Sequence, residues 1–159
     1  MGHNAVMTPG TESSARVVSA ERIVAAPRSR IFELIADPAR QPEWDGNDNL
    51  TAAERGRRVR RVGDVFTMRL TKPGAVRENH VVEFDEGRLI AWLPSEVGKN
   101  PPGHLWRWEL FEHADGTRVV HTYDWTELHD PKREARARAT TSERLASSID
   151  RLARLAESG

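Results

Sequence analysis

Seven stretches of the chain carry the alternating or short continuous hydrophobic patterns that are typical of β-strands. Turn signals separate most of them, and Asp115-Gly116 is the clearest, because Asp-Gly between alternating segments favours a hairpin. Connections this short join antiparallel neighbours. A segment rich in proline and glycine, Pro94–Gly103, is predicted to be a loop. The predicted strands are Val17–Val24, Leu50–Glu54, Asp64–Leu70, Arg77–Phe84, Arg88–Leu93, Leu105–Glu112 and Thr117–Glu127.

Two short helical segments are predicted directly after the first strand. Pro27 suits the first position of a helix, where its missing N–H has no intrahelical partner in any case. An apolar face follows between Ile31 and Ile35. Asp37-Pro38 ends this helix, because a residue before proline is pushed out of the α region. A second short turn then leads to Trp44, which stands alone among polar residues.

A long C-terminal helix is predicted from Asp130, a good N-cap, and Pro131. Its second half carries one apolar stripe with spacing 4, 3 and 4, formed by Leu145, Ile149, Leu152 and Ala156. Its first half, Lys132–Thr141, has only alanines to turn toward the sheet. That half therefore either covers a cavity or overhangs solvent.

Strand alternation also predicts which side chains face the interior, because successive residues point to opposite faces of a sheet. The strand Arg88–Leu93 leaves two choices, Ile90 with Trp92 or the alternate set Leu89, Ala91 and Leu93. The other expected inward residues are Phe66, Met68, Leu70, His80, Val82, Phe84, Trp106, Trp108, Leu110, Val119, His121, Tyr123 and Trp125. Histidine, tyrosine and tryptophan bring polar atoms that need partners when buried. A wet or ligand-filled cavity supplies such partners better than a dry core does.

The order of strand, short helix, Asp-Pro, short turn and tryptophan resembles the START-like (SRPBCC) superfamily, which includes polyketide cyclase/dehydrase-like, lipid-transfer-like and Bet v 1-like proteins. The residues that match are Ile23–Pro27, Ile31–Ala36, Asp37-Pro38 and Trp44. The resemblance extends over roughly Val17–Ala156, nearly the whole chain. It implies an α+β helix-grip fold, in which a curved antiparallel sheet of six or seven strands surrounds a long C-terminal helix and a cavity. It implies no catalytic motif.

Composition narrows the chemistry further. A chain of 159 residues fits one domain, expected at residues 17–159 after a flexible tail at residues 1–16. The 24 basic and 24 acidic residues balance, so no overall field attracts nucleic acid or an anionic membrane. The absence of cysteine excludes disulfides, thiolate catalysis and cysteine-ligated metals. With no secretory signal and no apolar run long enough to span a membrane, a cytoplasmic location is expected.

The leading hypothesis is a protein that binds a hydrophobic or aromatic small molecule, such as a polyketide, a sterol-like lipid or a fatty acyl compound. Apolar walls with a few polar groups are the usual character of such a pocket. The expected ligand-binding residues are Phe66, Met68, His80, Trp92, Trp106, Trp108, His121, Tyr123 and Trp125. No metal-ligand spacing, phosphate-binding loop or nucleophile elbow occurs, so we expect no metal and no cofactor.

Two alternatives remain open. An enzyme of the cyclase or dehydratase kind would use His80, His121 or Tyr123 as acid or base. A chaperone-like partner is the third possibility, as in the Hsp90-activator relatives of the superfamily. The basic clusters Arg55–Arg61 and Lys132–Arg138 are either solvated faces or a surface for an acidic partner. Either a monomer or a homodimer fits the sequence.

Overall fold

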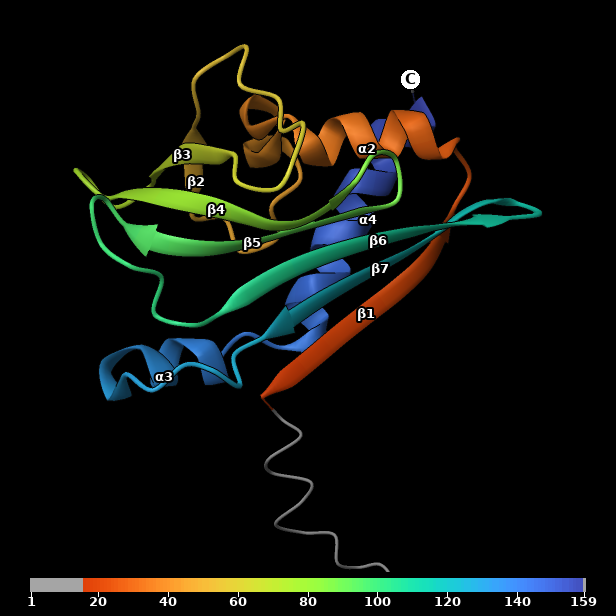
Figure 1. Ribbon diagram of the computed structural model, residues 1–159. Helices are drawn as coiled ribbons and strands as arrows, with labels where there is room; N and C mark the ends of the chain where they lie inside the picture. The colour runs from red at the N-terminus through yellow and green to blue at the C-terminus, as the bar shows by residue number, and fades with distance from the viewer. Residues whose placement is uncertain (1–15, 159) are drawn as a thin grey trace, which may run out of the picture.

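A computed structural model describes residues 16–158, and Figure 1 shows a curved sheet with helices packed against it. The strands are β1 (Val17–Val24), β2 (Leu50–Ala52), β3 (Val65–Leu70), β4 (Val76–Asp85), β5 (Leu89–Glu96), β6 (Leu105–His113) and β7 (Gly116–Asp124). The helices are α2 (Arg28–Ala36), the short 3-10 helix η1 (Pro38–Glu43), α3 (Pro131–Arg138) and α4 (Ser142–Ser158). The tail predicted at residues 1–16 lies outside the described residues, apart from Arg16.

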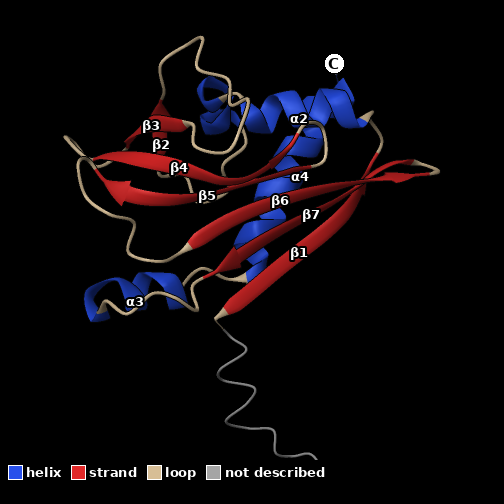
Figure 2. Cartoon of the chain, viewed as in Figure 1, coloured by secondary structure: helices blue, strands red, loops and turns tan. Residues whose placement is uncertain are grey.

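The sheet has the order β1-β7-β6-β5-β4-β3-β2, and every neighbouring pair is antiparallel. Strands β2 to β7 follow one another as a meander, whereas β1 pairs with the last strand, so that Val17 lies opposite Asp124. In Figure 2, α4 crosses one face of this sheet and α2 packs near one end. The arrangement is an α+β helix-grip fold, as the sequence predicted.

The hydrophobic core consists of two clusters of buried side chains. The larger joins α2, the sheet and α4, and includes Phe32, Trp108 and Ile149. The smaller one is formed by Tyr123, Trp125, Leu128, Ala137 and Leu145. Ala20 and Trp106 pack against both clusters and are the residues that connect them.

The predicted orientation of one strand was wrong. In β4 the side chains of Arg77 and Asn79 line a cavity and Val81 is buried, whereas Val82 is 39% exposed. The register with β5 shifts between Val81 and Glu83, which is the signature of a β-bulge. Because the extra residue reverses the alternation, Phe84 still packs inward against Phe32, with 5.7 Å between ring centroids. Phe84 was therefore predicted correctly, but His80 and Val82 were not.

The long C-terminal helix is present as α4, but its predicted start at Asp130 was wrong, because the segment is broken into α3 and α4. Thr140 donates from its backbone N–H to Ala137 O (3.0 Å) and from its hydroxyl to Arg136 O (3.2 Å), which closes α3. The Thr141 hydroxyl then accepts the Arg144 N–H at 3.3 Å, as an N-cap does. At the other boundaries, β2 is shorter than predicted, β5 continues through Pro94 to Glu96, and β7 ends before Trp125.

Candidate functional site

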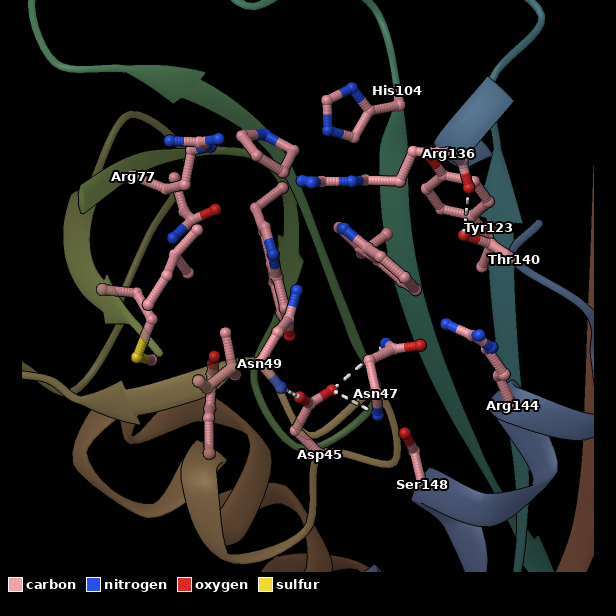
Figure 3. Close-up of a pocket in the computed structure, with 18 of the residues that line it drawn as sticks. Asp45, Asn47, Asn49, Arg77, His104, Tyr123, Arg136, Thr140, Arg144 and Ser148 are labelled. Carbon is pink, nitrogen blue, oxygen red and sulfur yellow. Dashed lines mark hydrogen bonds between the residues drawn. The ribbon is translucent and has the colours of Figure 1, made fainter. Parts of the chain in front are cut away.

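A cavity of about 660 Å³ lies between the concave face of the sheet and the helical segments (Figure 3). Strands β3 to β7 form one wall, and the segment from η1 to β2 forms a second. Thr140 between α3 and α4, with Arg136, Arg144 and Ser148 of these helices, completes the third. Arg136 and Thr140 of the alanine-rich segment line this cavity, whereas Ala135 and Ala139 are exposed, so each of the two alternatives for this segment holds in part.

The sheet side of the cavity is an aromatic wall built by β5, β6 and β7. The imidazole of His121 stacks on Trp108, with centroids 3.6 Å apart and planes at 11°, and faces Trp106 at 5.7 Å and 20°. Tyr123 lies 4.3 Å from Trp106 between ring centroids. The cross-strand pairs Trp106–Tyr123 and Trp108–His121 explain this stack, because directly opposed residues on one face have neighbouring side chains.

His121 is held in one tautomer by the sheet itself. Its Nδ1 lies 3.0 Å from the backbone oxygen of Arg107, which can only accept, so Nδ1 carries the proton and Nε2 keeps a lone pair. Burial lowers the pKa of His121 to about 3, and the bond to Arg107 opposes that change. Burial also raises the pKa of Tyr123 to about 12. Near neutral pH the wall therefore offers neutral donors and acceptors rather than charges.

Two buried nitrogen atoms of the cavity have no hydrogen-bond partner among residues 16–158. One is Nε1 of Trp108, whose side chain is 1% exposed, and the other is Nδ1 of His104. An unpartnered buried polar atom costs about 1–3 kcal/mol. His104 lies edge-on to Tyr123 at 6.0 Å, and its pKa is lowered to about 4, first by burial and then by the charges of Arg133, Arg77 and Arg136.

The wall opposite the tryptophans is polar and is formed by the loop Asp45–Asn49. The carboxylate of Asp45 accepts from Asn47 N (3.3 Å), Asn47 Nδ2 (3.2 Å) and Asn49 N (3.3 Å), which fixes the loop (Figure 3). Burial raises the pKa of Asp45, although these hydrogen bonds partly oppose the shift.

Gly46 fastens this polar loop to α4. Its N–H donates to the hydroxyl of Ser148 at 2.8 Å. A Cβ at position 46 would lie 2.7 Å from the backbone nitrogen of Ser148 and 2.9 Å from the backbone oxygen of Arg144. Glycine is required here by this close approach to the helix, and the approach positions Asp45 and Asn47 at the cavity.

Six of the nine ligand-binding residues expected from the sequence line the cavity: Met68, Trp92, Trp106, Trp108, His121 and Tyr123. Because Trp92 lines the cavity, Ile90 and Trp92 are the inward set of β5, and the alternate set Leu89, Ala91 and Leu93 is not. Phe66 is buried behind the wall and packs edge-on against Trp92 at 5.4 Å. Trp125 lies in the smaller core cluster, beneath the guanidinium groups of Arg16 and Arg138.

His80 lies on the face of β4 away from the cavity. Its Nε2 is 3.0 Å from the hydroxyl of Ser95, which in turn donates to Glu78 O at 3.3 Å. His80 therefore belongs to a hydrogen-bonded pair on the outer face, and it is not among the residues that line the cavity.

Several residues that line the cavity could not be expected from the sequence pattern. Asp45, Asn47 and Asn49 lie in a loop without periodicity, and Arg77 and Asn79 are placed by the bulge. Arg136 belongs to the basic cluster Lys132–Arg138, which was noticed but not assigned. The other cluster, Arg55–Arg61, includes Arg58, which pairs with Glu33 and Glu86 and lies over Phe32.

Comparison with known proteins agrees with this geometry. A model of the family described as "Polyketide cyclase / dehydrase and lipid transport" matches residues 15–157. The chain belongs to this family. The match confirms the resemblance to the START-like superfamily that the first strand, the short helices and Trp44 indicated.

Several proteins are similar to this member of the polyketide cyclase/dehydrase and lipid-transport family. An uncharacterised protein of Mycobacterium tuberculosis is 31% identical over 106 residues, which cover 64% of this chain but only 44% of that protein. A solved structure from Nitrosomonas europaea has a TM-score of 0.68 at 16% identity, covering 91% of this chain and 96% of that one. A Polyketide_cyc-like protein of Corynebacterium glutamicum has a TM-score of 0.61 at 17% identity, covering 89% and 91%. These structures show the shared fold.

Residues 16–158 were also compared with the requirements of a metal site and of a membrane-spanning helix. They contain no group of three or more His, Cys, Asp or Glu side chains placed to hold a metal ion. None of the helices in this range combines the length and the hydropathy that a membrane crossing requires.

Proposed function

We propose that this chain binds a hydrophobic or aromatic small molecule, such as a polyketide-, sterol- or lipid-like compound, in the cavity between the sheet and the C-terminal helices. The observation that carries the proposal is the aromatic wall with the unpartnered indole N–H of Trp108. Flat rings offer a large apolar contact area, and an orphaned donor beside them can fix the orientation of a carbonyl or hydroxyl. The cavity volume of about 660 Å³ is within the range of small-molecule sites.

Tryptophan fluorescence tests this proposal directly, because three tryptophans of the wall would contact the ligand. We expect flavonoids, aromatic polyketides, sterols or fatty acids to shift the emission and to raise the melting temperature. A panel that leaves both quantities unchanged would contradict the proposal.

Trp108→Phe sharpens the test, because it keeps a ring in the wall but removes the N–H. For a ligand with a carbonyl or hydroxyl group we expect about 5- to 30-fold weaker binding, since a hydrogen bond is worth roughly 1–2 kcal/mol. Trp125→Phe is the matched control, because Trp125 is equally buried but does not line the cavity. If Trp108→Phe and Trp125→Phe bind the ligand with equal affinity, the indole N–H of Trp108 does not orient the ligand.

An enzyme of the cyclase or dehydratase kind is the second candidate, and the fixed tautomer of His121 beside Tyr123 is the observation that favours it. The lone pair on Nε2 could accept a proton, and the phenol could donate one. The pKa of about 3 makes His121 a weak base, which favours binding over catalysis.

His121→Leu and Tyr123→Phe distinguish the two candidates. If the chain only binds its ligand, each change should weaken binding about 10- to 100-fold, because a buried partner is left unpaired. If it is an enzyme, turnover should collapse while the affinity for the product stays similar. Calorimetric titration and a turnover assay on the same two variants measure both quantities.

A further inference from the structure

The charges around the cavity differ from those of the whole chain. The chain as a whole has a formal net charge of zero. The residues that line the cavity include four basic side chains (Lys72, Arg77, Arg136 and Arg144) but only two acidic ones (Asp45 and Glu96). Glu96 is already paired with Arg133, and burial raises the pKa of Asp45. Positive charge is therefore concentrated at the cavity without a matching number of free carboxylates.

Three arginines produce most of this excess, and none of them forms an ion pair with a carboxylate of residues 16–158. Arg77 comes from β4, Arg136 from α3 and Arg144 from α4. The contrast within α3 is informative, because Arg133 binds Asp130 and Glu96 whereas Arg136, one turn later, lines the cavity without such a partner.

The three arginines surround the outer part of the cavity. Figure 3 shows Arg136 extending from α3 into the space next to His104, and Arg144 pointing into it from α4. Figure 3 also shows Arg77 and Arg136 at the same end of the cavity as His104, and their charges contribute to the lowered pKa of that histidine. Arg136 and Arg144 are exposed, whereas Trp108 and His121 of the same cavity are only 1% and 3% exposed. The cavity thus combines a cationic mouth with an aromatic interior.

We propose that the ligand is an amphipathic organic acid, whose anionic group binds at the end of the cavity formed by Arg77 and Arg136, with Arg144 adding positive charge from α4, while its apolar body packs against the tryptophan wall. The inference rests on the proposed binding function and adds the chemical class of the ligand. Guanidinium groups bind carboxylate and phosphate oxygens in a two-pronged geometry, and such charged hydrogen bonds are stronger than neutral ones. An anion at the mouth would neutralise charges that no described carboxylate neutralises.

A matched set of single-chain compounds tests the class of ligand. Dodecanoate, 1-dodecanol and dodecyl phosphate share one apolar body and differ in the head group, and 2-naphthoate with its methyl ester repeats the comparison on an aromatic body. In calorimetric titrations at pH 7 we expect the acid of at least one series to bind at least about 10-fold more tightly than its neutral analogue. Comparison of dodecanoate with dodecyl phosphate then shows which acid group the arginines prefer.

Variants connect this preference to the arginines. Arg77→Gln and Arg136→Gln should each weaken binding of the preferred acid about 10-fold and leave the neutral analogue within about twofold. Arg154→Gln is the matched control, because Arg154 is an exposed arginine of α4 that does not line the cavity. Raising the salt concentration should reduce the acid preference, since mobile ions screen exposed charges.

The possible outcomes separate the two proposals. If acids and neutral analogues bind equally well, or if the two arginine variants keep the parent preference, the inference about the acid group is wrong and the binding function stands. If no compound of either series or of the wider panel binds, the proposed function itself is wrong.

Discussion

His121 illustrates how one residue can be shaped by its surroundings. The backbone oxygen of Arg107 holds the proton on Nδ1, and the ring stacks on the indole of Trp108 and faces that of Trp106. Burial therefore keeps the imidazole neutral, with a pKa lowered to about 3. The residue that sequence reasoning treated as a candidate base acts, in this environment, as a flat neutral part of the wall.

This environment makes the stability of the protein depend on pH. Unfolded His121 titrates near pH 6.5, whereas the folded residue binds its proton only near pH 3. Between these values the unfolded chain binds more protons than the folded protein. The free energy of unfolding therefore has its full value, as far as His121 is concerned, above pH 6.5 and decreases as the pH falls below it. We expect His121→Gln, measured by urea unfolding from pH 6.5 to 4.5, to show a shallower decrease than the parent. The control is His129→Gln, which changes an exposed histidine and should leave the pH dependence of the free energy of unfolding as in the parent. If His121→Gln also leaves that dependence unchanged, the prediction is wrong.

Strand alternation was sufficient to predict the side chains of the wall wherever the strand is regular. Met68 in β3, Trp106 and Trp108 in β6, and His121 and Tyr123 in β7 all face the cavity as predicted. His80 failed because alternation cannot reveal an inserted residue. His104 and Arg136 could not be placed, because their positions depend on a loop and on the break between two helices. Whether these residues bind a ligand stays a prediction.

At the level of secondary structure, the boundaries follow local chemistry that the sequence shows only in part. The Asp130 side chain caps α3 through Lys132 N at 3.0 Å, as its sequence suggested. The break before α4 depends on the hydroxyl groups of Thr140 and Thr141, which a helical stripe that begins at Leu145 does not reveal. Both helix ends matter for the site, because Arg136 and Arg144 lie on opposite sides of the break.

The contact between the polar loop and α4 gives a prediction at this level. Gly46→Ala introduces a methyl group 2.7 Å from a backbone atom of Ser148, so the loop or the helix has to move. We expect a loss of about 1–3 kcal/mol in the free energy of unfolding, as for other overpacked sites. Asn47→Ala adds no atoms near α4 and should cost less. Equal losses in chemical denaturation would show that the close approach to α4 is not what makes glycine necessary.

At the level of the whole molecule, the cavity weakens the connection between the two core clusters. Its lining includes Trp44, Trp92 and Trp108 from the larger cluster and Tyr123 from the smaller one. Ala20 and Trp106 pack against both. The fold could be predicted because each element of the order from the first strand to Trp44 has a local signature. A cavity between the sheet and the C-terminal helices could be predicted as well, but its polar lining from the loop Asp45–Asn49 and the bulged strand β4 could not, because that lining depends on how distant elements approach each other.

We expect the contacts of Ala20 and Trp106 to keep the two core clusters in one cooperative unit, since a single domain of this size usually unfolds in one step. Unfolding in urea followed by tryptophan fluorescence and by far-UV circular dichroism should give coincident transitions. Trp106→Ala, which removes the larger connecting side chain, should lower the midpoint and separate the two curves. A parent protein with two separate transitions would show that the smaller cluster, with α3, unfolds independently.

The pairing of β1 with β7 has a consequence for folding during synthesis on the ribosome. Val17–Val24 are synthesised before every other strand of the sheet, yet their partners are the residues from Thr117 to Asp124. The backbone N–H and C=O groups of β1 that face β7 therefore stay unpaired until about one hundred further residues have been added. Contacts between such distant parts of a chain slow folding, and an unpaired strand edge invites association with other chains. Nascent chains stalled before Thr117 has emerged from the ribosome should thus need protection by chaperones, whereas those in which Asp124 has emerged can pair β1 with β7.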